Sequence, residues 1–229
     1  MPESGTGGSA RPAVARNHLR GWHSRGYLPH YEMPDLVQHV TLHLADSLPR
    51  EALERIKADM ERVPPAERHA GKRRRIEEWV DAGHGCCVLG DPEIAATMRE
   101  ALLHFDGERY SLLAWVVMPN HMHALIRPSN GWTIPQIVAA WKKHVVYALV
   151  KRRQRGAAEE GSDESRNRTG SARERRLWQR EYWDRYMRNE NHMSETIEYI
   201  HMNPVKAQLV ARPEDWPWSS AHLARPAGK

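Results

Sequence analysis

The chain has 229 residues, a length that fits one domain or one domain with appendages. Its 34 Lys and Arg residues outnumber its 29 Asp and Glu residues, so the net charge is +5 at pH 7 and the pI is about 9.4. The two cysteines, Cys86 and Cys87, are adjacent, which excludes an ordinary disulfide framework and favours the reducing cytoplasm. Neither a signal peptide nor a membrane-spanning apolar run is expected.

Residues 1–32 are rich in Gly, Ser, Pro, Ala and Arg and predict a flexible N-terminal arm. Trp22, Tyr27 and Tyr31 indicate that the end of this arm docks on the domain or binds a ligand. The domain itself is predicted over residues 33–222, with a short tail over 223–229. Its first expected elements are a strand over 36–45, helices over 50–62 and 67–82, a short strand over 86–89, and a helix over 92–104 that begins near Asp91.

Two apolar, β-prone runs joined by Met118-Pro119-Asn120-His121 predict a hairpin over 110–127. On its second strand His121 and His123 point to the same face, with α-carbons about 6.7 Å apart, and the alternate residues point to the core. Two neutral imidazoles at this separation can bind one divalent ion at about 2.0–2.1 Å each. Because the chain has 14 histidines, a chance pair that is solvated or hydrogen-bonded is the alternative interpretation.

After the hairpin, the sequence predicts two helices separated by a polar insertion. The first helix is expected over about 135–153, and the Gly-, Ser- and charge-rich residues 156–172 predict a disordered insertion. Apolar residues at helical spacing predict a short amphipathic helix over 194–202. Near the end of the chain, Trp216-Pro217-Trp218 is expected to cover the core.

Tyr199 and Asn203 are four positions apart, so a phenol and an amide lie on one face of the expected helix. Each has a structural explanation as well. Pro204 disfavours helical dihedrals at Asn203, which could then be the N-cap of a following helix. Tyr199 could be a half-buried aromatic residue with a solvated hydroxyl.

Positive charge is concentrated between Lys142 and Arg188, where fourteen basic residues face seven acidic ones. Aromatic residues are interspersed with these charges, which suits a phosphate backbone and stacking on unpaired bases. The alternative for Trp141 and Tyr147 is that they pack inward from a helix whose Lys and Arg residues are its solvated face. The basic residues expected to bind nucleic acid are Lys142, Lys143, Arg180, Arg185, Arg188 and Lys206.

Five motifs follow one another within residues 34–222. They are Pro119-Asn120-His121-Met122-His123, Trp178-Gln179-Arg180, Tyr182-Trp183-Asp184-Arg185, Tyr199-Ile200-x-x-Asn203-Pro204-Val205-Lys206 and Trp216-Pro217-Trp218-Ser219-Ser220. Together they resemble the single-tyrosine transposases of the HUH nuclease superfamily, and most closely the REP-associated tyrosine transposases. The resemblance implies an α+β, ferredoxin-like fold, with helices packed on an antiparallel sheet and the HUH pair on a central strand.

The resemblance also implies roles for individual residues. His121 and His123 would be the metal-binding pair, Asn203 the third metal ligand and Tyr199 the nucleophile. Mg²⁺ or Mn²⁺ is expected, because the ligands include an amide oxygen and phosphate oxygens and no thiolate. The implied activity is metal-dependent cleavage and rejoining of single-stranded or hairpin DNA with palindromic repeats, through a 5′-phosphotyrosine intermediate.

Two alternatives remain open beside this DNA-strand transferase. An HUH replication initiator or relaxase would share the chemistry, but the chain's length and the lack of a helicase or oligomerisation segment favour a transposase. A non-catalytic DNA-binding protein would use only the basic segment. We expect a monomer that acts in cis in the cytoplasm and is nucleoid-associated when bound to DNA, although the insertion over 156–172 is long enough to permit a swapped dimer.

Other candidate residues are assigned to structure. Tyr182 and Tyr186 are also phenols, but neither has an amide four residues later. His39 and His43 share one face of the first strand, yet at about 13 Å apart they could not share one ion. His201 is interpreted as structural or DNA-contacting.

Overall fold

A computed structural model describes residues 21–24, 29–159 and 176–223. Its strands are β1 (Gly21–Ser24), β2 (Pro29–Glu32), β3 (Gln38–His43), β4 (Tyr110–Val117), β5 (His121–Pro128) and β6 (Trp183–Tyr186). Its helices are α1 (Arg50–Glu61), α2 (Pro65–Asp81), α3 (Pro92–Leu103), α4 (Ile134–Glu159), α5 (Glu190–Lys206) and α6 (Ser220–Leu223), with short 3₁₀ turns η1 (Val88–Gly90) and η3 (Pro213–Asp215).

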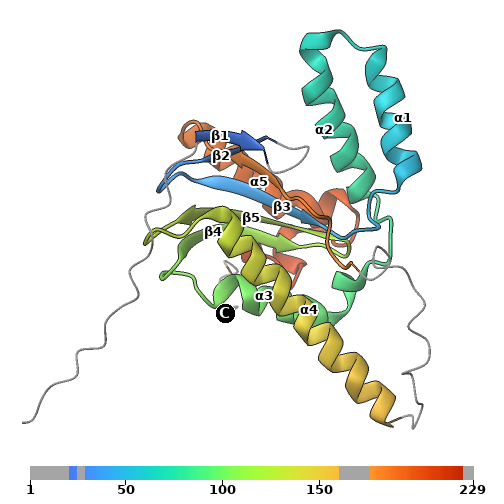
Figure 1. Cartoon of the computed structure of the whole chain (residues 1–229), viewed down its shortest axis with the longest axis vertical. Coiled ribbons are helices and arrows are strands. Elements are labelled where there is room, and N and C mark those ends of the chain that lie inside the picture. The colour runs from blue at the N-terminus through green and yellow to red at the C-terminus, as the bar shows by residue number, and fades with distance from the viewer. Residues whose placement is uncertain (1–20, 25–28, 160–175, 224–229) are drawn as a thin grey trace, which may run out of the picture.

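The centre of the molecule is a four-stranded antiparallel sheet in the order β4-β5-β3-β6. Helix α3 precedes β4 and helix α4 follows β5, which gives the β-α-β-β-α-β order of a ferredoxin-like fold. Both helices cover one face of the sheet, and α5 covers the other (Figure 1). The predicted α+β fold class is therefore confirmed, with β5 as a central strand.

Alternation along β5 divides its side chains between two cores. Met122, Ala124 and Ile126 belong to the large core between the sheet and helices α3 and α4. Leu125 belongs to a smaller core that includes Ile200 of α5. The two histidines of β5 therefore face α5.

Helices α1 and α2 form a hairpin that projects from the end of the sheet (Figure 1). Both helices match their predicted positions closely. They bury a small apolar cluster of their own, and the partly buried Trp183 of β6 packs against it. The buried members are Leu48, Ala52, Ile56, Met60, Ile76 and Val80.

The short strand predicted over 86–89 is wrong. Gly83 and Gly85 have positive φ angles, and Cys87 has a left-handed backbone with φ of 49°, so the chain bends before it enters η1. The backbone N–H of Leu89 instead donates to the carbonyl of Pro119 at 3.0 Å. This loop is thereby attached to the turn that leads into β5.

The end of the predicted N-terminal arm forms a two-stranded antiparallel sheet, β1 with β2. The rings of Trp22 and Tyr31 lie 5.1 Å apart, and the ring of Tyr31 lies 5.1 Å from that of Tyr186 in β6. Through these contacts the end of the arm docks on the domain. Residues 1–20 and Tyr27 lie outside the described part of the chain.

Helix α4 is longer than predicted and includes residues 156–159, which were expected to begin the disordered insertion. Residues 160–172 of that insertion lie outside the described residues. The N-terminal half of α4 is buried against the sheet through Ile137, Trp141 and Val145. Trp141 therefore packs inward, as the alternative interpretation proposed, whereas Tyr147 is 67% exposed.

Helix α5 continues through Pro204, so the expectation that Asn203 caps a new helix is wrong. Proline removes one backbone donor, but here it lies in the last turn, and the N–H groups of Ala207 and Leu209 still bond to the carbonyls of Asn203 and Pro204. The cap of the helix is Asn189, whose side chain accepts from the N–H of His192.

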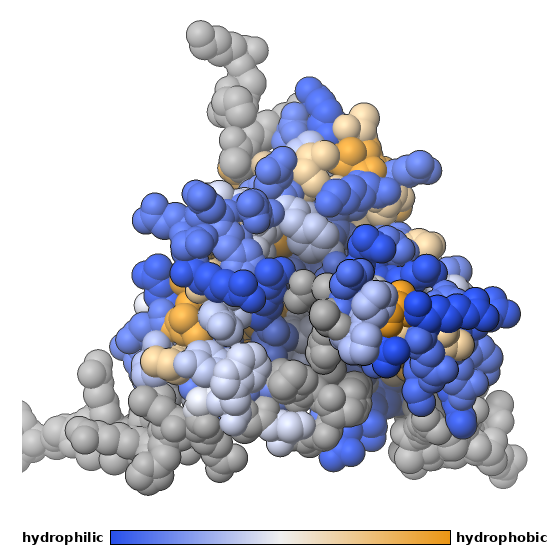
Figure 2. Space-filling model, turned by 90° about the horizontal axis from the view of Figure 1, so that it is seen from above, coloured by the Kyte–Doolittle hydropathy of each residue, from blue (hydrophilic) through white to orange (hydrophobic). Residues whose placement is uncertain are grey.

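The C-terminal segment covers the core, as predicted, with Trp218 packed on the large core and Trp216 on the smaller one. Trp216 donates its indole N–H to the carbonyl of Val117, and the N–H of Val117 donates to the carbonyl of Trp218. Seen from the side of the α1–α2 hairpin, the surface is mostly hydrophilic, with scattered apolar residues (Figure 2). Among the described helices, none has the length and apolar character needed to cross a membrane.

Candidate active site

The histidine pair of β5 lies on the face of the sheet that α5 covers. His121 is 1% exposed and His123 is 2% exposed, and their ring centroids are 4.8 Å apart. The pair is therefore not solvated, although both rings have polar partners, so the hydrogen-bonded alternative stays open. Both rings point into the layer between the sheet and α5 because the alternate residues fill the large core.

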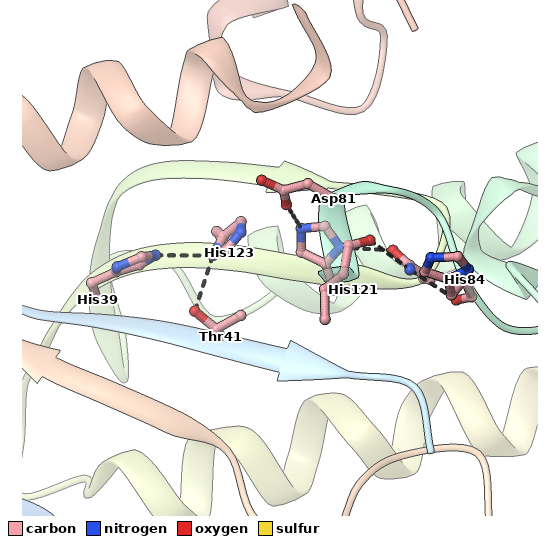
Figure 3. A network of polar contacts seen from close by, with 8 residues as sticks. His39, Thr41, Asp81, His84, His121 and His123 are labelled. Atoms are coloured by element: carbon pink, nitrogen blue, oxygen red, sulfur yellow. Dashed lines mark hydrogen bonds and ion pairs between the residues drawn. The ribbon is translucent and has the colours of Figure 1, made fainter. Parts of the chain in front are cut away.

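Each imidazole is oriented through its Nδ1 atom. The Nδ1 of His121 lies 2.8 Å from the Oδ1 of Asn120, and the Nδ1 of His123 lies 3.0 Å from the Oγ1 of Thr41 and 3.0 Å from the Nε2 of His39 (Figure 3). The two Nε2 atoms are buried and make no hydrogen bond within the described structure. Histidines that bind metals are oriented in this way, with one nitrogen held by the protein and the other left for the ion.

Burial keeps these imidazoles neutral. Desolvation lowers the pKa of His121 to about 3, and it lowers the pKa of His123 well below 6.5, with a further decrease from the neighbouring histidines. A neutral imidazole has the lone pair that a metal requires. At neutral pH the pair is therefore ready to bind a cation without releasing a proton from these two rings.

The adjacent strand β3 adds two more histidines to the same face. Thr41 pairs with His123 and His43 with His121 in the antiparallel register, which places His39 diagonally beside His123. The ring of His43 lies 6.0 Å from that of His121, and desolvation lowers its pKa to about 4. The sequence predicted that His39 and His43 share one face of their strand. It could not predict that they lie beside the β5 pair, because the register depends on pairing between distant strands.

Helix α5 brings Tyr199 and Asn203 to the same layer. The ring centroid of Tyr199 lies 5.4 Å from that of His123 and 6.0 Å from that of His39. Asn203 is fully buried, and neither of its amide atoms has a hydrogen-bond partner of ordinary geometry in the described structure. Its side chain still lies close enough to His121 to raise the pKa of that imidazole against the effect of burial. The phenol, the amide and the imidazoles thus converge within one chain.

Asp81, the last residue of α2, also reaches this cluster and was not identified from the sequence. Its Oδ1 lies 3.5 Å from the Nε2 of His121, and the ligand atoms of Asp81, His121 and His123 lie within 4.8 Å of one another. Burial, followed by the charge of Glu77, raises the pKa of Asp81 to about 6. The sequence offered only an aspartate at a helix end, since no linear spacing relates it to the His-x-His motif.

The predicted DNA-binding residues separate into three pairs. Lys206 lies at the end of α5 with its Nζ 4.8 Å from the centre of the Tyr199 ring, and Arg185 pairs with His39 across the sheet on the same face. Both side chains are exposed. Lys142 and Lys143 are on α4, across the sheet, where Lys142 donates to the carbonyl of Gln179 and burial lowers its pKa to about 8. Arg180 and Arg188 are exposed at either end of the segment that contains β6.

The other tyrosines and His201 lie away from the histidine pair. Tyr182 is buried in the large core on the opposite face of the sheet, with its ring 4.7 Å from that of His30. Tyr186 contacts the aromatic residues of the β1–β2 sheet. His201 bonds through Nε2 to the Oγ of Ser220 at 2.8 Å, which is a structural role.

The donor atoms in this layer fit a hard divalent cation. Two neutral imidazoles, a carboxylate and a carboxamide oxygen are available, with no thiolate among them. Such a set suits Mg²⁺ or Mn²⁺. The buried Nε2 of His123 and the buried Oδ1 of Asn203 are polar atoms that an ion would satisfy.

Fold and site together define a ferredoxin-like domain with a His-x-His pair on its central strand and a helix-borne tyrosine beside that pair. No family model matches the chain. It is 27% identical over 130 residues to the REP-associated tyrosine transposase of Escherichia coli K12, a match that covers 55% of this chain and 63% of that protein. It is 28% identical over 131 residues to a protein of Haemophilus influenzae named "Putative REP-associated tyrosine transposase", a match that covers 57% of this chain and 68% of that protein.

A solved structure supports the fold. The structure of a REP-associated tyrosine transposase bound to a REP hairpin superposes with a TM-score of 0.51 at 19% identity, covering 89% of this chain and 92% of that one. The sequence match spans just under two thirds of the E. coli relative. The chain is thus related to the REP-associated tyrosine transposases, as its motifs predicted.

Proposed function

We propose that this protein is a DNA-strand transferase that cleaves and rejoins single-stranded or hairpin DNA through a covalent phosphotyrosine at Tyr199. The observation that carries the proposal is the approach of the Tyr199 ring to within 5.4 Å of the His123 ring. These residues come from separate elements, α5 and β5, and share a layer with two further donors. The relation to REP-associated tyrosine transposases supports the same activity.

In the proposed reaction the phenolic oxygen of Tyr199 attacks a backbone phosphorus. The bond from phosphorus to the 3′-oxygen breaks, the phenolic proton is lost, and the 3′-oxygen takes up a proton. The products are a 5′-phosphotyrosine and a free 3′-hydroxyl. Because the phosphodiester is exchanged for another phosphoester, a 3′-hydroxyl can later attack the phosphotyrosine and rejoin the strands.

His121, His123 and Asn203 would hold a divalent cation beside the scissile phosphate. When bound, the cation supplies positive charge that polarises the phosphate and stabilises the leaving oxygen. Lys206, near the Tyr199 ring, would stabilise the negative charge that develops on the attacking oxygen. Thr41 and Asn120 would orient the two imidazoles from the protein side.

The proposed substrate is DNA that folds into a hairpin at a palindromic repeat. The related solved structure, whose protein is bound to a REP hairpin, supports this choice. The exposed Arg185 and Lys206 provide positive charge at the site, which suits a polyanion. We also propose action in cis, because Tyr199 and Asn203 of α5 lie beside the histidine pair of β5 without residues of a second subunit. The monomeric state and the cytoplasmic location stay predictions of the sequence resemblance.

The test is an oligonucleotide assay with hairpins taken from the flanks of the gene, in MgCl₂ or MnCl₂, with adducts resolved on denaturing gels. Phe variants at 182, 186 and 199 are compared at equal folded concentration. Only Tyr199→Phe should lose the adduct, while hairpin binding persists. Retention of the adduct in Tyr199→Phe would overturn the assignment, and hairpin binding without cleavage under any metal or salt condition would favour the non-catalytic alternative.

A further inference from the structure

One carboxylate reaches the histidine pair from outside the ferredoxin-like core. Asp81 lies at the base of the projecting α1–α2 hairpin and its side chain is 21% exposed. Its Oδ1 faces the Nε2 of His121 at 3.5 Å (Figure 3). Asp81 and the two histidines are the one group of three His, Cys, Asp or Glu residues with metal-like spacing in the described part of the chain.

The protein fixes which nitrogen of His121 carries the proton. Asn120 donates its amide N–H groups to the carbonyls of Val80 at 2.8 Å and His84 at 2.9 Å. Its Oδ1 must therefore be the acceptor at 2.8 Å from the Nδ1 of His121, which places the proton on Nδ1. In neutral His121 the Nε2 atom is then an acceptor.

An acceptor nitrogen and a carboxylate oxygen thus face each other, and neither carries a proton that could form a hydrogen bond between them. Two such groups attract each other only through a shared proton or a cation between them. The Nε2 of the buried His123 lies beside this pair without a hydrogen bond in the described structure, and it is a third acceptor in the tautomer whose Nδ1–H donates to Thr41. With His123 in that tautomer, three acceptors converge in a buried layer, which is the arrangement that a metal ion satisfies.

Asp81 is also tethered to the strand that bears the histidines. The Asn120 amide binds the carbonyls on both sides of Asp81, at Val80 and His84. Further along the loop, the N–H of Cys86 donates to the Oδ2 of Asp46 at 2.7 Å, beside the end of β3. The carboxylate is therefore positioned against the site and does not move freely at the surface.

We propose that Asp81 is a further protein ligand of the divalent ion held by His121 and His123, delivered by the α1–α2 hairpin. This inference rests on the proposed function, since it assumes that the histidine pair binds metal. A carboxylate adds a hard, negatively charged oxygen to two imidazoles, which favours Mn²⁺ or Mg²⁺. The ion would then be held from three elements: β5, α5 and α2. Asn120 acts as a positioning residue that links two of them.

The test measures Mn²⁺ binding by the full chain without DNA, using the electron paramagnetic resonance signal of free Mn²⁺. Asp81→Asn removes the charge with the least change in shape, and Asp81→Ala removes every donor atom. We expect both variants to bind Mn²⁺ about tenfold or more weakly than the unmodified chain. The matched control is Glu78→Gln, which removes one charge from the same turn of α2 and should change the affinity by less than about twofold.

Circular dichroism and thermal unfolding without metal establish that each variant is folded. If Asp81→Ala does not fold, the test uses Asp81→Asn alone. If Asp81→Asn binds Mn²⁺ as tightly as the unmodified chain while His123→Ala does not bind it, Asp81 is not a ligand. In that case the proposed function still stands if the unmodified chain forms a metal-dependent adduct. A chain that neither binds Mn²⁺ nor forms an adduct would refute both proposals.

Discussion

At the scale of single residues, the site depends on two histidines that stay neutral and whose rings are oriented by polar contacts to Nδ1. Thr41 and Asn120 each occupy one Nδ1, and burial lowers the pKa of both imidazoles of β5. A lone pair is thereby kept on each ring at neutral pH. The same burial makes every uncompensated polar atom in this layer costly, which favours binding of a cation.

Lys206 offers a residue-scale prediction. Because its ammonium lies 4.8 Å from the Tyr199 ring, Lys206→Gln should slow adduct formation about threefold to tenfold, equivalent to about 1 kcal/mol of cation–π and Coulomb interaction. If the side chain also contacts a phosphate, the slope of log affinity against log salt should decrease by about one. Single-turnover assays and salt titrations measure the two effects.

The control for that prediction is Lys57→Gln, which removes the same charge from an exposed position on α1. It should leave the rate of adduct formation unchanged. Equal rates for Lys206→Gln and the unmodified chain would show that the ammonium does not act on the tyrosine.

Residues that are close in the sequence were placed correctly beside one another, whereas a residue that is distant in the sequence was missed. The shared face of His121 and His123 follows from strand alternation, and the shared face of Tyr199 and Asn203 from helical spacing, so both were predictable. Asp81 was not, because it meets the histidines only after the α1–α2 hairpin folds back against the turn that precedes β5. Its identification required the contacts of Asn120 with Val80 and His84.

At the scale of elements, helix α3 illustrates stabilisation away from the site. Asp91 caps the helix by accepting from the N–H of Glu93, and its other oxygen accepts from Arg152 at 2.6 Å. Loss of the cap in Asp91→Ala should lower the free energy of unfolding by about 1 kcal/mol, with little change in metal binding because α3 lies on the opposite face of the sheet. Urea titrations measure this loss.

Asp91→Asn separates the cap from the ion pair. Asparagine keeps the capping oxygen and loses the charge, and surface ion pairs contribute little, so this variant should be destabilised less than the alanine variant. Equal losses in both variants would instead assign the stabilisation to Arg152.

The predicted elements that failed share a physical cause. Residues 86–89 are apolar but contain no strand, because positive φ angles at Gly85 and Cys87 bend the loop and Leu89 bonds to Pro119. Helix α5 runs past Asn203 because packing of its apolar face on the sheet outweighs the loss of one donor at Pro204. In both cases tertiary contacts override a local preference.

At the scale of the whole molecule, acid should destabilise the fold through its buried histidines. The pKa of His43 is lowered to about 4 and that of His121 to about 3, whereas both titrate near 6.5 in the unfolded chain. The unfolded state therefore binds more protons between these values, and stability must fall as pH decreases from about 6.5 toward 4. Asp81 opposes this in part, since its raised pKa of about 6 lets the folded state take up a proton first.

His123 is buried in the same way, and its pKa is also lowered. These three imidazoles against the one carboxyl of Asp81 leave a net difference of roughly two protons near pH 5, or on the order of 2 to 3 kcal/mol per pH unit. Urea midpoints measured in EDTA between about pH 7 and 4.5 test this slope. His43→Gln should reduce it, and His104→Gln, at an exposed position, should not. A stability that is flat across this range would contradict the burial of neutral histidines.

The proposed function requires Tyr199 to be the attacking residue, and trypsin digestion tests this assignment directly. Cleavage after Arg180, Arg185, Arg188 and Lys206 separates the three candidate tyrosines into peptides 181–185, 186–188 and 189–206. After reaction with a hairpin oligonucleotide in MnCl₂ and nuclease trimming, mass spectrometry should find the nucleotide on Tyr199 in peptide 189–206. A nucleotide on peptide 181–185 or 186–188, or an adduct that forms equally well in EDTA, would contradict the account.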